Sequence, residues 1–188
     1  MNDALDLIMR RRSIRKYTDQ AVEPEKIECL LKAAMAAPTA MNMQPWEFIV
    51  IQDEAILKDI RKALVFGKIN APLAIVVCGN LSVFKRQLTE RFWVQDCSAA
   101  TQNILLAAVD MDLGSVWCGV HPINSFERQL SQILGLPGHV HPLNVIFIGY
   151  PAEVKEARTQ YQTDRIHYDR YDGNLNVSAN KALEHPEI

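Results

Sequence analysis

The sequence has almost no net charge and no long apolar run. Its 188 residues carry 20 Lys and Arg against 22 Asp and Glu, so the formal net charge is −2. A protein that coats nucleic acid needs a broad basic face, which this balance excludes. The longest strongly apolar runs, residues 73–78 and 104–109, are far too short to span a bilayer. We therefore expect neither a nucleic-acid partner nor a membrane partner.

Cysteine is scarce, and several familiar motifs are missing. The cysteines are widely spaced and mostly lie in apolar surroundings: Cys29, Cys78, Cys97 and Cys118. This pattern argues against a disulfide framework and, with no leader pattern after Met-Asn-Asp, predicts a cytoplasmic protein. No Gly-x-Gly-x-x-Gly follows a strand, and neither Gly-x-Ser-x-Gly nor His-Glu-x-x-His occurs. A Rossmann domain, an α/β-hydrolase and a zinc protease are therefore not indicated.

Helical and strand patterns alternate along the chain, and 48% of its residues are hydrophobic, as is typical of one globular domain. Apolar residues recur at helical spacing behind Pro24, which predicts a helix that ends before Pro38. Other periodic segments predict helices at 3–9, 54–64, 90–111 and 125–134, and strands at 46–51, 73–78, 115–120 and 144–150. These patterns alone establish only a mixed helix–strand domain.

The longest predicted helix, 90–111, is apolar all round in its middle, which places it at the centre of the fold with Gly114 as its cap. The tail from 159 onward is polar with scattered aromatics, so it either frays or wraps a partner subunit. We divide the chain into one domain, 1–172, and a polar tail, 173–188.

Five cations stand within seven residues at Arg10-Arg11-Arg12-Ser13-Ile14-Arg15-Lys16. Because this charge is local, it suits a single anionic ligand such as a phosphate monoester, which binds guanidinium groups and hydroxyl donors. The plain alternative is a solvated basic loop. Arg11-Arg12-Ser13 also fits a short basic phosphorylation motif, of a kind that is common by chance.

The basic segment is followed by further segments with polar or glycine-containing patterns: Pro38–Trp46, Gly114–Gly119, and Gly149–Pro151 with Arg158 downstream. In order and spacing these segments resemble the FMN-dependent nitroreductase family, from Arg11 to about Tyr171. The resemblance implies an α+β fold, in which helices flank a mixed, mostly antiparallel sheet. It also implies that the single domain binds FMN and forms an intertwined homodimer, with helix 90–111 at the dimer core and FMN at the interface.

Within this resemblance, Arg11 makes a bidentate contact to the FMN phosphate and Ser13 adds a hydroxyl donor. Arg12 reaches ribityl or phosphate oxygens, and Arg15 lies near the flavin N1/O2 edge, where a cation stabilises the reduced anionic flavin. Arg158 matches the first cation of a pair that closes over the phosphate, while Gln160 stands in the second place.

The resemblance brings a second group of residues to the flavin from the neighbouring subunit: Pro38, Thr39, Met41, Asn42 and Gln44. Their amide and hydroxyl groups suit the donors and acceptors of the pyrimidine edge. Ala40 stands where many relatives carry a second hydroxyl residue. The plain alternative is an ordinary helix-to-strand connection, and Trp46 is then a core residue.

The segment Trp117-Cys118-Gly119 supplies backbone N–H groups to the flavin N5 in the resembled family. Glycine lets the backbone approach a flat ring closely, and a neutral N–H donor helps hydride arrive. The plain alternatives are a bulge at Gly119 and inert packing for Cys118. We assign Cys118 no nucleophilic role.

The function implied is an FMN-dependent oxidoreductase that takes hydride from NADH or NADPH onto flavin N5. A nitroaromatic, quinone or similar acceptor then occupies the same place, in a ping-pong mechanism without a catalytic side chain. Two alternatives remain: a reductive dehalogenase or flavin-modifying relative, and a non-catalytic binder of FMN or another phosphate ligand. Phe92 and Trp93 line the pocket or belong to the core. A zinc site from Cys118, His121, His139 and His141 is the weakest alternative.

Overall fold

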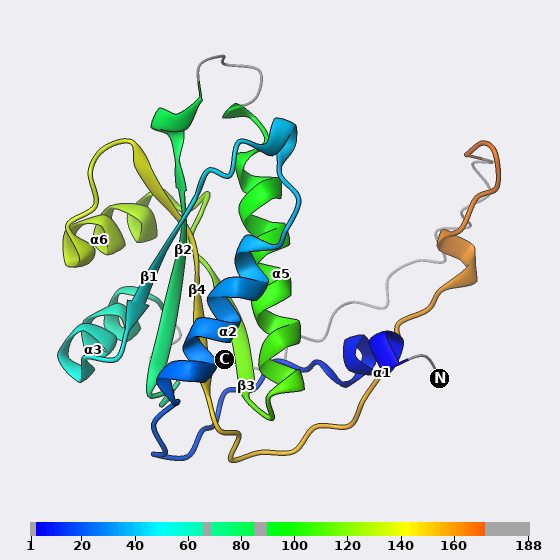
Figure 1. Cartoon of the computed structure of the whole chain (residues 1–188), viewed down its shortest axis with the longest axis horizontal. Helices are drawn as coiled ribbons and strands as arrows, with labels where there is room; N and C mark the ends of the chain where they lie inside the picture. The colour runs from blue at the N-terminus through cyan, green and yellow to red at the C-terminus, as the bar shows by residue number, and fades with distance from the viewer. Residues whose placement is uncertain (1–2, 66–68, 85–89, 172–188) are drawn as a thin grey trace. The chain divides into compact units, whose positions relative to one another are not determined.

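The computed structural model describes residues 3–65, 69–84 and 90–171 (Figure 1). The chain divides into two compact units, Met1–Ala157 and Arg158–Ile188. The described part of the second unit holds a short 3-10 turn, η3 (Thr163–Arg165), and a contact between the rings of His167 and Tyr171. The boundary expected at 172/173 lies at the end of the described residues and stays a prediction.

The first unit is built on a four-stranded sheet with the order β1-β2-β4-β3. The strands are β1 (Trp46–Ile51), β2 (Leu73–Asn80), β3 (Gly114–Gly119) and β4 (Val140–Gly149). All three pairings of neighbouring strands are antiparallel, and β1 and β3 form the two edges. The predicted α+β fold with a mostly antiparallel sheet is confirmed.

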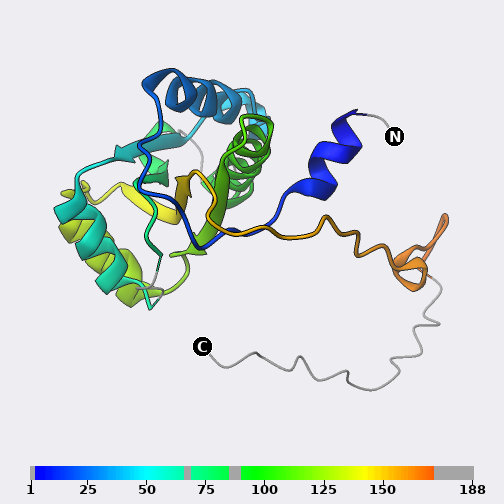
Figure 2. The same cartoon turned by 90° about the horizontal axis from the view of Figure 1, so that it is seen from below.

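Helices cover both faces of this sheet (Figures 1 and 2). On one face lie α2 (Pro24–Met35) and α5 (Trp93–Asp110), and on the other lie α3 (Glu54–Ala63) and α6 (Asn124–Leu134). Successive strand residues serve opposite faces: Ile75 packs with the α2 and α5 side, and Val76 with the α3 and α6 side. Because both faces are covered, β2 reads as one continuous apolar run.

Local sequence signals explain where the helices begin and end. Pro24 stands in the first turn of α2, and Asp53 caps α3 by accepting from the N–H of Ala55 at 2.8 Å. Gly135 ends α6 with a left-handed φ of 65°. The helix expected at 3–9 is α1 (Asp3–Arg10), which runs directly into the basic segment. Among the described residues, no helix is long and apolar enough to cross a membrane.

Two sequence-based expectations about boundaries were wrong. Gly114 does not cap the long helix: α5 ends at Asp110 with Met111 as its C-cap, Asp112 takes the left-handed φ of 60°, and Gly114 opens β3. A side chain at Gly114 would lie 2.8 Å from Ile14, so close packing explains the glycine. Strand β4 begins at Val140, before the expected residue 144, because a register shift near Cys78 accommodates Pro142 in the ladder.

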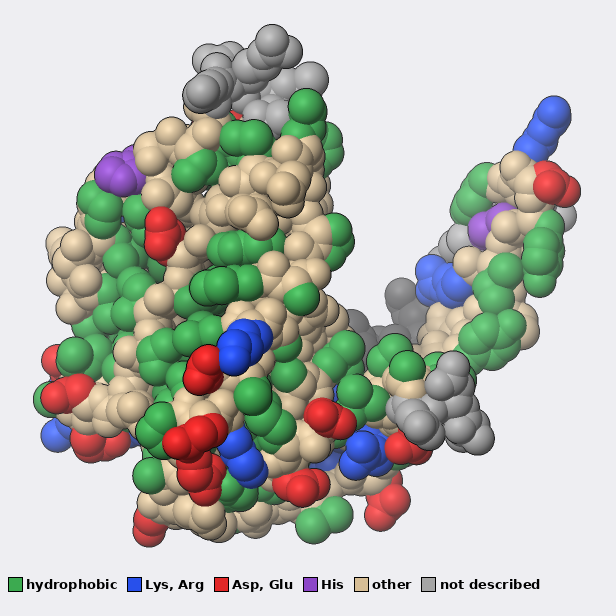
Figure 3. Space-filling view, in the orientation of Figure 1, with side chains coloured by type: hydrophobic (Ala, Val, Ile, Leu, Met, Phe, Trp, Pro, Cys, Tyr) green, Lys and Arg blue, Asp and Glu red, His purple; other side chains and the backbone are tan. Residues whose placement is uncertain are grey.

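Helix α5 is the longest helix described, but it lies on one face of the sheet and keeps a partly exposed side. Ile104, Leu105 and Ala108 are buried in the core, whereas Leu106 and Ala107 remain only partly buried. Figure 3 shows apolar and uncharged side chains over the upper part of the face that α2 and α5 form. Charged side chains gather toward its lower end.

Candidate functional site

The basic segment lies along the outer edge of β3. Ser13 forms a parallel bridge with Ser115, and the N–H of Ile14 donates to the Ser115 carbonyl at 3.0 Å. Tyr17 then bridges Pro151, directly after β4. The fold therefore brings together three of the segments that the sequence singled out: the basic segment, residues 114–119 and the segment after Gly149.

Beyond this bridge, no strand or bridge among the described residues pairs with the outer edge of β3, which is called the open edge below. Because the Ser115 carbonyl faces Ile14, strand alternation also points the N–H groups of Trp117 and Gly119 away from β4. The next residue, Val120, has the opposite orientation: its N–H donates toward the β4 side, to the Leu143 carbonyl at 3.0 Å. A Cβ at Gly119 would meet no atom within 4 Å among the described residues. The edge thus offers two backbone donors beside open space.

Cys118 points away from this edge. Its side chain is 3% exposed and packs in the core on the α3 and α6 side. Burial raises the pKa of the Cys118 thiol to about 11, against the opposing effect of the Arg15 charge. The thiol is therefore neutral near pH 7, which agrees with a packing role. Trp117, by contrast, is 37% exposed.

The chain after β4 holds the backbone of the basic segment in place. Lys155 Nζ donates to the Ser13 carbonyl at 2.7 Å, and the N–H of Arg15 donates to Glu153 Oε1 at 2.6 Å. Desolvation opposes ionisation of Glu153, but this bond and Lys155 outweigh it and lower the pKa of the carboxyl. Arg12 donates to the main-chain carbonyl of Glu156. Arg12 is therefore already engaged by the chain itself.

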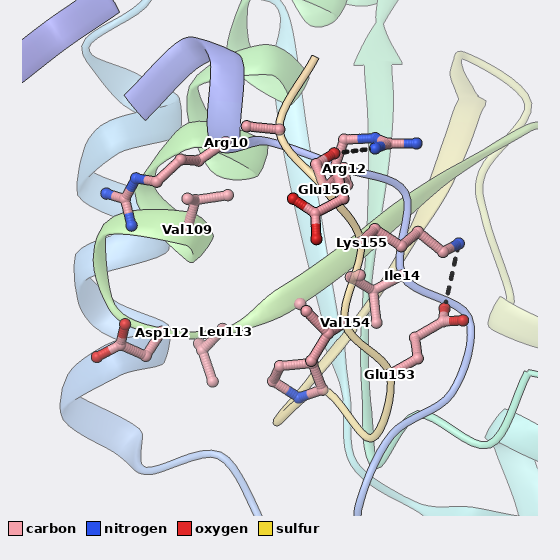
Figure 4. Close-up of a pocket in the computed structure, with 13 residues that line it drawn as sticks. Arg10, Arg12, Ile14, Val109, Asp112, Leu113, Glu153, Val154, Lys155 and Glu156 are labelled. Atoms are coloured by element: carbon pink, nitrogen blue, oxygen red, sulfur yellow. Dashed lines mark hydrogen bonds and ion pairs between the residues drawn. The ribbon is translucent and has the colours of Figure 1, made fainter. Parts of the chain in front are cut away.

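A cavity of about 480 Å³ lies behind the basic segment, between the ends of α1 and α5 and residues 151–157 (Figure 4). Of the predicted site residues, only Arg12 lines it. Its charged lining residues balance, with three cations against three carboxylates: Arg10, Arg12, Lys155, Asp112, Glu153 and Glu156. A neutral cavity has little attraction for a phosphate, so we place the candidate site at the open edge of β3.

Arg11 and Arg15 of the basic segment remain available to a ligand at that edge. Within the described residues, the guanidinium groups of Arg11 and Arg15 form no hydrogen bond and no ion pair. Arg11 is half-buried and Arg15 is exposed. Both side chains are therefore free to meet an anionic ligand without first breaking a contact.

The loop predicted to reach the cofactor has an unusual backbone. Met41, Asn42 and Gln44 all take left-handed φ values, of 52°, 54° and 50°. A residue with a side chain costs about 1–2 kcal/mol in this region, and Asn tolerates it best. Two bonds hold the shape: Thr39 Oγ1 accepts from the Gln44 N–H at 3.1 Å, and the Ala40 N–H donates to Asp96 at 2.9 Å. Maintained strain of this kind is common at functional sites.

Sequence reasoning missed Asp96, which supports this loop from the first turns of α5. The residue is 5% exposed; Oδ1 accepts from Ala40, and Oδ2 has no partner among the described residues. Desolvation raises the pKa of the Asp96 carboxyl, and the Ala40 N–H only partly offsets it. The available signal was a single acidic residue on the buried side of a helix, between Trp93 and Cys97.

Within one chain, this loop lies far from the open edge of β3. The loop leads into Trp46 on edge strand β1, three strand spacings from β3, or about 14 Å. Through the ladder, Trp46 lies level with His141, Trp117 with Ile146 and Gly119 with Asn144, which adds about 10–17 Å along the strands. Figure 1 shows this loop at the upper end of the first unit and the basic segment, in blue, at its lower end.

His121 lies in the turn after β3, one residue beyond Val120. Its Nδ1 lies 2.9 Å from Glu127 Oε1, and its ring meets the ring of Trp93 edge-on at 4.9 Å. Among the described residues, no three His, Cys, Asp or Glu side chains gather as metal ligands. Trp93 is buried against Gly79 as a core residue, and Phe92 is 41% exposed. Arg158 belongs to the second unit, so its predicted role remains a prediction.

Comparison with known proteins decides the family. A family model described as "Nitroreductase family" matches residues 8–66 and 64–150. The chain belongs to the nitroreductase family. A protein of Archaeoglobus fulgidus named "Putative NADH dehydrogenase/NAD(P)H nitroreductase" is 45% identical over 176 residues, which cover 91% of this chain and 100% of the relative.

Solved nitroreductase structures share the fold. An FMN-dependent nitroreductase of Clostridium difficile has a TM-score of 0.81 at 31% identity, covering 89% of this chain and 99% of that one. A structure described as a "putative nitroreductase in complex with fmn" from Desulfovibrio desulfuricans has a TM-score of 0.77 at 29% identity, and the match covers 91% of this chain and 99% of that one. The family and the fold that the sequence predicted are confirmed.

Proposed function

We propose that this member of the nitroreductase family is an FMN-dependent NAD(P)H oxidoreductase that reduces nitroaromatic, quinone or similar acceptors. The proposal is carried by the open edge of β3, where two outward N–H groups lie on the strand that the basic segment joins. The names of relatives, among them an FMN reductase (NADPH) of Bacillus subtilis, support the same chemistry. The enzyme class and the cofactor predicted from the sequence agree with them.

The residues at this edge fit FMN in charge and shape. Arg11 and Ser13 hold the phosphate, with Arg12 and Arg158 as further donors. Arg15 lies toward the N1/O2 edge, where its charge stabilises the reduced ring. When FMN is bound, the N–H of either Trp117 or Gly119 would donate to N5, and the missing Cβ of Gly119 would leave room for the flat ring.

We propose further that the site is completed in a homodimer. The separation of the 38–44 loop from the β3 edge within one chain supports this, because a single flavin needs both. Thr39, Asn42 and Gln44 of one subunit then face the pyrimidine edge of the flavin bound to the other, with Pro38 and Met41 beside them. The partly exposed side of α5 supports a subunit contact there.

In this mechanism the residues of the chain bind FMN, orient it and shield it from solvent, while FMN, when bound, supplies the hydride-transfer chemistry. Arg11 and Ser13 fix the phosphate end, so that the ring end is positioned against β3. The outward N–H groups donate hydrogen bonds without titrating, which keeps their effect independent of pH. With one open face, NAD(P)H and acceptor bind in turn, which gives ping-pong kinetics. A cytoplasmic location remains a prediction.

Steady-state oxidation of NADH and NADPH by the FMN-loaded protein, with menadione or nitrofurazone as acceptor, tests the proposal. Turnover with parallel double-reciprocal lines is expected for a ping-pong oxidoreductase. FMN binding without NAD(P)H oxidation by any acceptor would favour the alternative of a non-catalytic binder. Release of halide from a halophenol substrate would instead favour a dehalogenase relative.

A further inference from the structure

The pair of His121 and Glu127 lies just beyond the proposed flavin contact and has no part in the function described above. His121 stands two residues after Gly119, in the turn that joins β3 to α6. Glu127, in the first turns of α6, places Oε1 2.9 Å from Nδ1. The imidazole is thus fixed at one nitrogen, in the turn that follows the β3 residues of the proposed flavin site.

The second ring nitrogen of this imidazole is available. Within the described residues, Nε2 of His121 has no hydrogen-bond partner, and 31% of the side chain is exposed. The Trp93 ring packs against the imidazole at 4.9 Å and limits its rotation. The contact with the Glu127 carboxylate fixes the orientation of the ring and leaves Nε2 as the nitrogen available to a ligand, as in general acid–base pairs. His141, 6.3 Å from the same Trp93 ring, is the other titratable group nearby.

Reduction of the acceptor creates a need for a proton. A p-quinone that receives hydride on one oxygen becomes a hydroquinone monoanion, with both transferred electrons in the ring system. One proton on the second oxygen then completes the hydroquinone. No bond to a leaving group breaks, whereas a nitro group must also lose an oxygen as water. One imidazolium donor therefore meets the whole proton requirement of a quinone.

We propose that His121 is the general acid that protonates a quinone acceptor, and that Glu127 positions it. The Nε2–H bond breaks, the proton passes to the quinone oxygen that did not receive hydride, and the neutral imidazole is reprotonated from solvent. His121 is then a catalytic residue, and Glu127 acts through it. This inference rests on the proposed function and deepens it by naming the residue that protonates a quinone acceptor.

The test separates proton-coupled from proton-free oxidation in stopped-flow experiments on the FMN-loaded protein. His121→Gln removes the acid but keeps an amide that can bond to Glu127, and His139→Gln is the matched control at an exposed histidine. Oxidation by 1,4-benzoquinone should slow by about 100-fold in His121→Gln. Oxidation by ferricyanide, which takes electrons without protons, should change less than about twofold, as should FMN content and the reduction of FMN by NADH.

Glu127→Gln tests the positioning role. It should slow the benzoquinone reaction by about tenfold and leave the ferricyanide reaction unchanged, because the acid remains but loses its carboxylate partner. Equal slowing with both oxidants would indicate general damage to the site and would overturn the proposal. Unchanged rates with benzoquinone in His121→Gln would do the same. A wild-type protein that binds no FMN would contradict the proposed function itself, which is a separate outcome.

A second readout does not depend on turnover. Hydroquinone is titrated into the oxidised, FMN-loaded protein labelled with ¹⁵N-histidine. The Nε2 signal that disappears in His121→Gln should shift with saturation, while the signal lost in His139→Gln stays fixed. A His121 signal that does not move at saturating hydroquinone would show that the imidazole does not touch the bound ring.

Discussion

Ser13 lies beside Ser115 in a parallel bridge that occupies only the first part of the outer edge of β3. The bridge anchors the basic segment, and the remaining edge from Trp117 to Gly119 stays open. The charged residues and the backbone donors therefore lie on one continuous edge. Because the charges come from the basic segment and the backbone donors from β3, single substitutions can test the two groups separately.

Arg11→Ala should weaken FMN binding by about 10- to 100-fold, because a charge-assisted bond contributes about 1.5–3 kcal/mol. The guanidinium of Arg11 has no partner among the described residues, so its loss should leave folding unchanged. Lys16→Ala removes the same charge from the same segment and is the control. Fluorescence titration with FMN measures both, and equal affinities in the two variants would contradict the assignment.

Gly119→Val should abolish FMN retention without harming the fold. Its side chain would enter open space, so we expect the melting temperature to change by only about 1–2 °C. Gly79→Ala is the contrasting control, because its Cβ would lie within 3.0 Å of the Trp93 ring and should cost about 1–3 kcal/mol. Thermal melts and flavin content measure both effects; a Gly119→Val protein that keeps FMN would exclude ring packing at this glycine.

Mixed dimers test whether two subunits share each site. A chain carrying Arg11→Ala and a chain carrying Asn42→Ala with Gln44→Ala should each bind FMN poorly as homodimers. Refolded together, they should form a heterodimer with one intact and one doubly altered site. The expected stoichiometry is one tightly bound FMN per heterodimer. No recovery of tight binding in a purified heterodimer would place both segments at the same subunit's site.

Asp96 should make stability depend on pH. Because the pKa of its carboxyl is raised in the folded state, the folded protein holds the proton more tightly than the unfolded chain. Its contribution to stability is therefore fully present below the ordinary aspartate pKa and is lost as pH rises through the raised value. Asp96→Asn lacks this loss, so the melting temperature of the variant relative to wild type should rise from pH 3.5 to pH 7.

Asp96→Ala provides the control for the bond to the loop. The asparagine can still accept from the Ala40 N–H, whereas alanine cannot, so the alanine variant should lose loop order and FMN affinity as well. A difference in melting temperature that is constant with pH would show that Asp96 titrates normally in the folded protein.

The sequence was most informative where periodicity and turn chemistry act locally. Pro24 and Asp53 mark the starts of α2 and α3, and the apolar run of β2 marks a strand covered on both faces. It was misleading at Pro142, which reads as a loop residue but lies in β4 at a register shift. It was also misleading at Gly114, where packing against Ile14 rather than a helix cap explains the glycine.

The sequence alone predicted only some of the functional residues. Charge density and resemblance identified the basic segment, but no local pattern says that Ser13 lies against Ser115, because that contact joins residues about 100 positions apart. Asp96 and the left-handed backbone of Met41 and Asn42 depend on tertiary contacts for the same reason. The pairing of His121 with Glu127 spans the turn between β3 and α6, and only the fold shows that it leaves Nε2 free.

The central claim is that FMN bound at the β3 edge carries hydride. The most direct measurement is the visible spectrum of the purified protein before and after anaerobic addition of NADH or NADPH. Two flavin bands near 370 and 450 nm that bleach on addition, with flavin largely lost in Arg11→Ala, are the predicted result. A colourless protein that cannot be reconstituted with FMN, or a bound flavin that neither nucleotide bleaches, would contradict the account.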